Sequence, residues 1–99
     1  MADNTQQKAK IDFPTEKTLL QALKLSLKFT KPIDTYFYLD SLKGKCKIIN
    51  DGDDSILYKN DDEHTSPILK LFKSDNAYIV ITNHTIYLIS VNTEIKKTD

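Results

Sequence analysis

The fold is decided by residues 77–91, which read AYIVITNHTIYLISV. Two runs rich in β-branched and aromatic residues flank a central Asn-His pair, a pattern typical of a β-hairpin. With a two-residue turn, alternate side chains fall on opposite faces. One face then carries Ile79, Ile81, Ile86 and Leu88, and the other carries Tyr78, Val80, Tyr87 and Ile89. Both faces are apolar, so we expect the hairpin to be covered on both sides.

Upstream of the hairpin, a helix is predicted over about residues 15–29. Thr15 is the expected N-cap, and Pro32 ends the helix because the residue before a proline avoids helical angles. Residues 23–29 also alternate as a strand would, but their Leu, Lys, Gln and Ala neighbours favour helix. We expect the leucine stripe of this helix to pack on the all-aliphatic face of the hairpin through Leu20, Leu23 and Leu27. That stripe consists of Leu19, Leu20, Leu23 and Leu27.

The rest of the chain has the pattern of short strands and turns. Strands are predicted over residues 34–42, 45–50, 55–59, 77–82 and 85–91. Asp51-Gly52 predicts a type I′ hairpin turn between the second and third of these. Residues 60–67 form a polar loop, and residues 68–73 are compatible with a short helix or a strand. The predicted fold class is α+β, with one N-terminal helix packed on an antiparallel sheet of about five strands.

The length of 99 residues is that of one domain. We expect residues 1–12 to form a flexible tail, residues 13–91 a single domain, and residues 92–99 a polar tail. The first ten residues lack the apolar region of a signal peptide, and no run of about 18 apolar residues is present. We therefore expect an intracellular protein that does not enter membranes.

Composition and spacing argue against several chemistries. Only Gly44 and Gly52 are present, too few for a glycine-rich phosphate loop. His64, His84 and Cys46 lack the short spacing of zinc ligands. The acidic residues 51–62 depart from a calcium loop because Ile56 stands where glycine is required. We expect no catalytic site, no cofactor and no metal, and a binding or assembly role.

Charge argues against nucleic acid as the main partner. The 14 basic residues balance 14 acidic ones, and all of the basic residues are lysine. Without a net positive field or arginine forks, duplex DNA readout is disfavoured. An alternative function is weak binding of single-stranded nucleic acid through the aromatic and lysine residues of segment 36–47. The competing interpretation is that these aromatic residues fill the core. Its candidate contacts are Tyr36, Tyr38, Lys43, Lys45 and Lys47.

The favoured function is protein binding or self-assembly. The candidate contact surface is the Tyr-bearing face of the hairpin, because tyrosine combines apolar area with a polar tip. Its members are Tyr78, Val80, Tyr87 and Ile89. A second candidate is the loop containing His64, Thr65 and Ser66. The alternative role of these residues is capping and turn formation. A small ligand site or enzyme around His64 is a less favoured interpretation.

Cys46 is the only cysteine, so no intrachain disulfide forms. A buried, inert thiol is the favoured interpretation. The alternative is a thiol made reactive by the flanking lysines, which lower a thiol pKa when they lie close.

Three segments together resemble small uncharacterised proteins of nucleocytoplasmic large DNA viruses. They are Lys31-Pro32-Ile33 before the aromatic run, Thr65-Ser66-Pro67-Ile68, and Tyr78–Thr82 leading to Ile86-Tyr87. The resemblance spans about residues 18–91 and contains no catalytic motif. It implies a small viral structural or accessory protein, located in the virion or the host cytoplasm.

Overall fold

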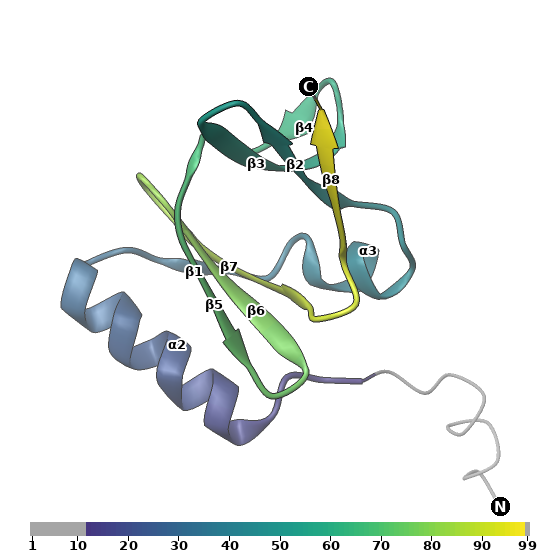
Figure 1. Ribbon diagram of the computed structural model, residues 1–99. Coiled ribbons are helices and arrows are strands. Elements are labelled where there is room, and N and C mark those ends of the chain that lie inside the picture. Colours follow the sequence, from purple (N-terminus) through teal and green to yellow (C-terminus); the bar gives the residue numbers. More distant parts are fainter. Residues whose placement is uncertain (1–11, 99) are drawn as a thin grey trace, which may run out of the picture.

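The structure is a computed structural model that describes residues 12–98. The predicted N-terminal tail therefore lies almost wholly outside the described residues. Within the described residues the chain is α+β, with two helices and eight strands in two mixed sheets of four (Figure 1). The helices are α2 (Glu16–Phe29) and α3 (Tyr38–Leu42). The strands are β1 (Ile33–Asp34), β2 (Lys47–Asp51), β3 (Asp54–Asn60), β4 (Glu63–His64), β5 (Ile68–Ser74), β6 (Ala77–Thr82), β7 (Ile86–Ser90) and β8 (Glu94–Thr98).

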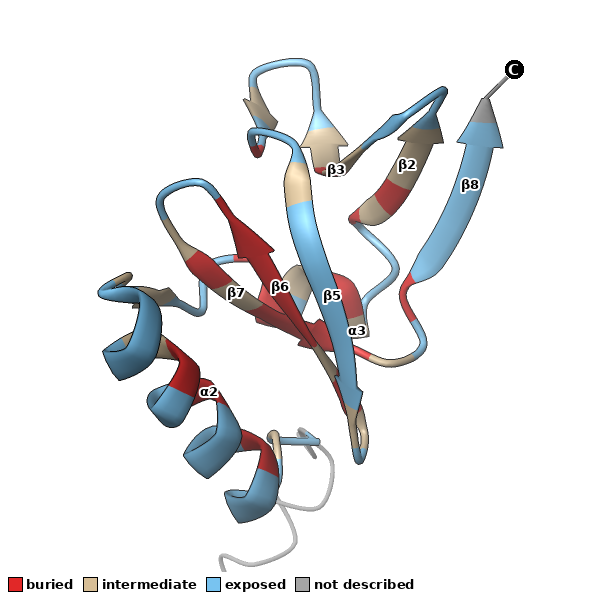
Figure 2. Ribbon diagram, turned by 60° about the vertical axis from the view of Figure 1, so that its left-hand side comes forward, coloured by how far each residue is buried: buried red, intermediate tan, exposed pale blue. Residues whose placement is uncertain are grey.

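The two sheets form layers around the β6–β7 hairpin. Sheet A has the strand order β1-β7-β6-β5, and sheet B has the order β4-β3-β2-β8. Helix α2 covers one face of sheet A, while sheet B lies on the other (Figure 1). Helix α3 packs against β7, with Tyr38 in the cluster under α2. The hairpin is therefore the central layer, and Figure 2 shows its two strands as the most buried part of the molecule. Cover on both faces, expected from the apolar pattern, is confirmed.

The hairpin register agrees with the sequence pattern. Ile81 pairs with Ile86, and Val80 pairs with Tyr87. The aliphatic face belongs to the core cluster under α2, and the Tyr-bearing face belongs to the cluster under sheet B. Period-two alternation thus assigns each hairpin residue to one of two separate cores.

Helix α2 forms where predicted, with the Thr15 hydroxyl accepting a hydrogen bond from the amide of Thr18 at 3.3 Å. The predicted packing stripe is wrong. The face against sheet A carries Thr18, Ala22 and Leu25 instead. All four leucines of the predicted stripe are exposed, namely Leu19, Leu20, Leu23 and Leu27.

The predicted strand over residues 34–42 is also wrong. It ends after Asp34, whose side chain accepts a hydrogen bond from the amide of Tyr36 at 2.8 Å and starts a turn. Helix α3 follows and packs its buried residues against the end of β7, where the Ser41 hydroxyl accepts from the amide of Ser90 at 2.8 Å. Strong β propensity is overridden here by a local turn and by tertiary contacts.

The C-terminal segment was expected to be a tail, but residues 94–98 form strand β8. It pairs in parallel with β2, and β1 pairs in parallel with β7, so neither sheet is purely antiparallel. The predicted single sheet of about five strands is replaced by two sheets of four. The β2–β3 hairpin forms where predicted, but only Gly52 has a positive φ (65°), whereas a type I′ turn requires two such residues.

Candidate protein-binding site

Strand β5 is the outermost strand of sheet A. Within residues 12–98, no strand pairs with its outer edge. Three large apolar side chains are exposed on it, at 53% for Leu69 and 39% for both Leu71 and Phe72. Figure 2 shows β5 as an exposed strand beside the buried β6. An edge with unpaired backbone groups and exposed apolar side chains is a template for one more strand.

The pairing of β5 with β6 contains one irregularity that shapes this edge. Ile68 pairs with Thr82 and Lys70 pairs with Ile81, so Leu69 is an extra residue, as in a β-bulge. From Lys70 to Ser74 the pairing is one to one. Residues 70–74 therefore form the regular part of the free edge.

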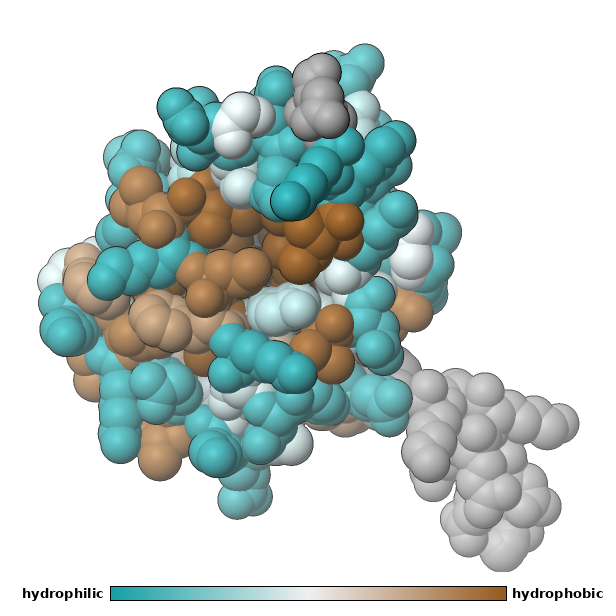
Figure 3. Space-filling model, in the orientation of Figure 1, coloured by the Kyte–Doolittle hydropathy of each residue, from teal (hydrophilic) through white to brown (hydrophobic). Residues whose placement is uncertain are grey.

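A groove runs between β5 and sheet B. It has a cavity volume of about 260 Å³ and receives side chains from β2, β3, β5 and β8. Its apolar lining consists of Ile48, Ile68, Leu69, Leu71 and Ile95. Figure 3 shows hydrophobic side chains gathered across the middle of the molecular face that carries β5 and β8. This inter-sheet groove can accept apolar side chains from a bound segment.

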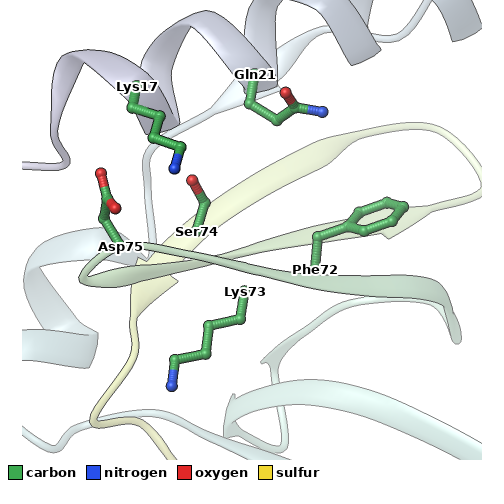
Figure 4. Close-up of a pocket in the computed structure, with 6 residues that line it drawn as sticks. All are labelled: Lys17, Gln21, Phe72, Lys73, Ser74 and Asp75. Atoms are coloured by element: carbon green, nitrogen blue, oxygen red, sulfur yellow. The ribbon is translucent and has the colours of Figure 1, made fainter.

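A second groove lies on the other side of β5, against helix α2. Its volume is also about 260 Å³, and Lys17 and Gln21 of the helix line it together with residues 72–75. In Figure 4, Phe72 and Ser74 point towards the helix, whereas Lys73 points away from it. This helix-side groove is more polar than the inter-sheet groove, and β5 separates the two.

The helix is fixed beside β5 by hydrogen bonds at one end. The buried hydroxyl of Thr18 donates to the carbonyl oxygen of Ser74 at 2.9 Å. Thr15 donates to the carboxylate of Asp75 at 2.5 Å, in the turn after β5. These contacts hold the N-terminal end of α2 against the end of β5, so the helix-side groove has defined walls.

The charge on the free edge is positive. Strand β5 carries Lys70 and Lys73 and no carboxylate, and Lys17 lines the adjacent groove. In the part of the chain that the structure describes, both ion pairs are made by Lys59, which lies on β3. The amino groups of Lys70 and Lys73 therefore have no carboxylate partner within residues 12–98.

The contact surface predicted on the hairpin is largely covered, although Tyr78 and Tyr87 are partly exposed. Val80 and Ile89 are both 0% exposed, and Tyr78 and Tyr87 pack against the same cluster under sheet B. Phe37 meets the ring of Tyr87 edge-on, with centroids 5.5 Å apart. Sheet B, formed partly by the unrecognised strand β8, covers much of this face, and partner contact through Tyr78 and Tyr87 stays a prediction.

The loop containing His64, Thr65 and Ser66 divides into a structural part and an exposed part. Thr65 is buried, and its hydroxyl accepts a hydrogen bond from the amide of Leu57 at 3.1 Å. His64 is exposed and stacks on Tyr58, with ring centroids 6.4 Å apart. Ser66 is exposed, and no hydroxyl nucleophile and base face each other here.

The residues of the alternative nucleic-acid site are not brought together as a stacking platform. Tyr36 is exposed, but Tyr38 is buried in the cluster under α2 and donates to the carbonyl oxygen of Asp12 at 2.5 Å. Burial raises the pKa of Tyr38. Lys43 and Lys45 are exposed in the turn after α3, and Lys47 is half-buried on β2. A base can therefore stack on at most one of the two predicted tyrosines.

The densest group of interacting charges joins α3 to sheet B. Lys59 lies 3.1 Å from Asp40 and 3.6 Å from Glu63, and the hydroxyl of Tyr36 donates to Glu63. That hydrogen bond lowers the pKa of Glu63 and raises the pKa of Tyr36, while the contact with Asp40 raises the pKa of Lys59. These shifts favour charged Glu63, charged Lys59 and neutral Tyr36, which are the forms that the network pairs, so the network ties α3 to sheet B.

Cys46 is 4% exposed and lies in the cluster under sheet B. Its thiol donates weakly to the carbonyl oxygen of Phe37 at 3.8 Å. Burial raises the pKa of Cys46 to about 11, despite the neighbouring lysines in sequence. The inert interpretation of this thiol is therefore favoured over the reactive one.

Residues 12–98 contain no cluster of three His, Cys, Asp or Glu side chains placed to hold a metal ion. Neither helix in that range is long and apolar enough to cross a membrane. No family model, curated protein or solved structure matches this chain. The geometry of the chain itself is therefore the basis for assigning a function.

Proposed function

We propose that this chain is a non-enzymatic protein-binding module that holds an extended segment of a partner protein against the free edge of β5. One observation carries the proposal. A seven-residue edge strand exposes three large apolar side chains and lies between two grooves. Edge strands in proteins bind extended segments through main-chain hydrogen bonds, while neighbouring pockets select the side chains.

The position of β5 supports this proposal further. The strand is held on its inner side by β6 and at its end by the Thr18–Ser74 hydrogen bond. It therefore does not need to rearrange before a segment binds, and the ordering cost falls mainly on the partner. The central hairpin behind it is buried on both faces, which gives the edge a rigid support.

Selection of random displayed peptides tests the proposal. We expect peptides enriched on the native protein to shift the backbone amide resonances of residues 70–74, because those amides form the regular part of the edge. Leu71→Lys places a charge at the mouth of the inter-sheet groove and should abolish binding. Leu27→Lys is the matched control, because Leu27 is an exposed leucine outside both grooves. Failure to enrich any peptide, or resonance shifts confined to other strands, would rule the proposal out.

The viral setting implied by the resemblance stays a prediction. If it is right, the module is a structural or accessory protein, and mass spectrometry of purified virus particles would detect it in stoichiometric amounts. The nucleic-acid alternative loses support from the burial of Tyr38. We accordingly favour a protein partner.

A further inference from the structure

We infer that the segment bound at β5 contains two acidic residues separated by two apolar residues, an inference that rests on the proposed function. The regular edge reads Lys70, Leu71, Phe72, Lys73. Residues directly opposite each other on neighbouring strands contact one another, and opposite charges stabilise the pair. A segment that places carboxylates opposite the two lysines must place its intervening residues opposite Leu71 and Phe72.

The two apolar residues of this motif point in opposite directions, and each has a groove to enter. Leu71 pairs with Val80, which belongs to the cluster under sheet B, so the residue opposite Leu71 faces the inter-sheet groove. Phe72 pairs with Ile79, which belongs to the cluster under α2, so its opposite residue faces the helix-side groove. An apolar pair at these positions therefore contacts Leu71 and the apolar inter-sheet groove on one side, and the exposed ring of Phe72 on the other.

The charge preference also follows from the surroundings of the two lysines. Lys70 and Lys73 are exposed and have no carboxylate partner within residues 12–98. Lys17 adds a third positive charge in the helix-side groove. Asp75 lines the same groove at the end of β5, so the acidic residues belong opposite Lys70 and Lys73 rather than beyond Ser74.

A second copy of this chain fits the same edge poorly. Strand β5 contains no acidic residue, so no register of β5 against another β5 places a carboxylate opposite either lysine. A two-fold pairing would instead bring two lysines from each copy to one seam without counter-charge. Lysines on edge strands are a known protection against such pairing. The charges thus disfavour a homodimer and favour an acidic partner segment.

The motif reads the same in both chain directions. An order of acidic, apolar, apolar, acidic is unchanged by reversal, so it fits β5 in a parallel or an antiparallel pairing. The inference therefore requires no assumption about the orientation of the partner strand.

Seven-residue peptides matching the length of β5 test this inference by fluorescence anisotropy. The probe carries Glu-Val-Ile-Glu at its centre, and the comparison peptides carry Lys-Val-Ile-Lys or Ser-Val-Ile-Ser. We expect the Glu peptide to bind most tightly and the Ser peptide roughly threefold to thirtyfold less tightly, from the loss of two cross-strand charge pairs. Binding of the Glu peptide should weaken as salt is raised.

Reversing the two lysine charges on β5 distinguishes specific pairing of the peptide with this strand from general electrostatic attraction. The double variant Lys70→Glu, Lys73→Glu should reverse the preference and bind the Lys peptide. The matched control is Lys43→Glu, Lys45→Glu, which makes the same charge change at two exposed lysines after α3 and should keep the native preference. Circular dichroism checks that both variants are folded, as expected for substitutions of exposed side chains.

The possible failures are distinguishable. Equal binding of all three peptides at β5 would overturn the inference and leave the proposed function standing. If neither these peptides nor any selected peptide bound at β5, both the inference and the proposed function would be ruled out. Binding of phosphatidylserine vesicles through Lys70 and Lys73, without binding of the Glu peptide, would replace the acidic segment by an anionic membrane surface and overturn the inference.

Discussion

The β6–β7 hairpin and helix α2 are both rich in large aliphatic residues, yet they bury them very differently. Ile79, Val80 and Ile86 of the hairpin are all 0% exposed. On the helix, Leu20 is 53% exposed and Leu27 is 74% exposed, while the buried positions include Thr18 and Ala22. Figure 2 shows the same contrast, with red hairpin strands beside a helix that is mostly pale blue.

The difference shows that burial follows position in the layers more than side-chain hydrophobicity. The hairpin lies between two covering layers, so its aliphatic residues are buried whichever face they take. The helix is an outer layer with one inward face, and that face is selected by specific contacts. Thr18 bonds to Ser74, and Ala22 belongs to the same cluster as Ala77, where small side chains permit close approach.

The largest expected effect compares one residue from each element. Ile81→Ala should lower the free energy of unfolding by about 2–5 kcal/mol, as deletions of buried aliphatic groups do. Leu27→Ala should change it by less than about 0.5 kcal/mol, because the side chain is exposed. Urea unfolding of the two variants measures both values. A cost at Leu27 comparable to that at Ile81 would mean that the leucine stripe is packed against something after all.

The second prediction concerns the cover on the Tyr-bearing face of the hairpin. Because its pKa is raised from 9.0 to about 11, the Cys46 thiol should hold about a hundredfold less thiolate than an ordinary cysteine near neutral pH. We expect labelling by a thiol reagent to be at least about that much slower in the native protein than in urea. Rapid native labelling would show that sheet B opens away from the hairpin.

The third prediction concerns the inward face of the helix. Thr18→Val keeps the shape of the side chain but leaves the carbonyl oxygen of Ser74 without this hydrogen bond, which should cost about 1–3 kcal/mol of stability. Thr18→Ser retains the hydroxyl and is the matched control for hydrogen bonding. If Val were as stable as Thr, apolar packing alone would position the helix.

The contrast between hairpin and helix also explains what the sequence could predict. The hairpin register was predictable because a two-residue turn and period-two alternation leave one arrangement. The helix boundaries were predictable from Thr15 and Pro32, but its inward face was not, because Thr18 and Ala22 carry no hydrophobic signal. Strand β8 has a single large apolar residue, Ile95, and is defined mainly by backbone pairing with β2.

The exposed edge strand β5, the proposed binding site, was missed for a related reason. Leu71 and Phe72 are adjacent, so they fit neither a half-buried strand nor a helix over six residues. Two lysines among apolar residues are, however, a signature of an edge strand, and Lys70 and Lys73 could have suggested it. The layer that covers the predicted contact face on the hairpin could be recognised only in the structure, since nothing local reveals which element packs on Val80.

The smallest expected effect concerns Glu63, and it tests whether the charged network around Lys59 helps to join α3 to sheet B. The hydrogen bond from Tyr36 lowers the pKa of Glu63, so the stabilisation is fully present above the usual glutamate pKa and is lost as pH falls through the lowered value. Glu63→Gln should therefore be slightly less stable than the native protein at neutral pH, and the two should converge in acid. Glu94→Gln, at an exposed carboxylate on β8, is the control and should not reproduce this convergence. Thermal unfolding across the acidic range measures the difference. A gap between Glu63→Gln and the native protein that persisted in acid would mean that the variant perturbs packing, and that the charges around Lys59 do not help to hold α3 in place.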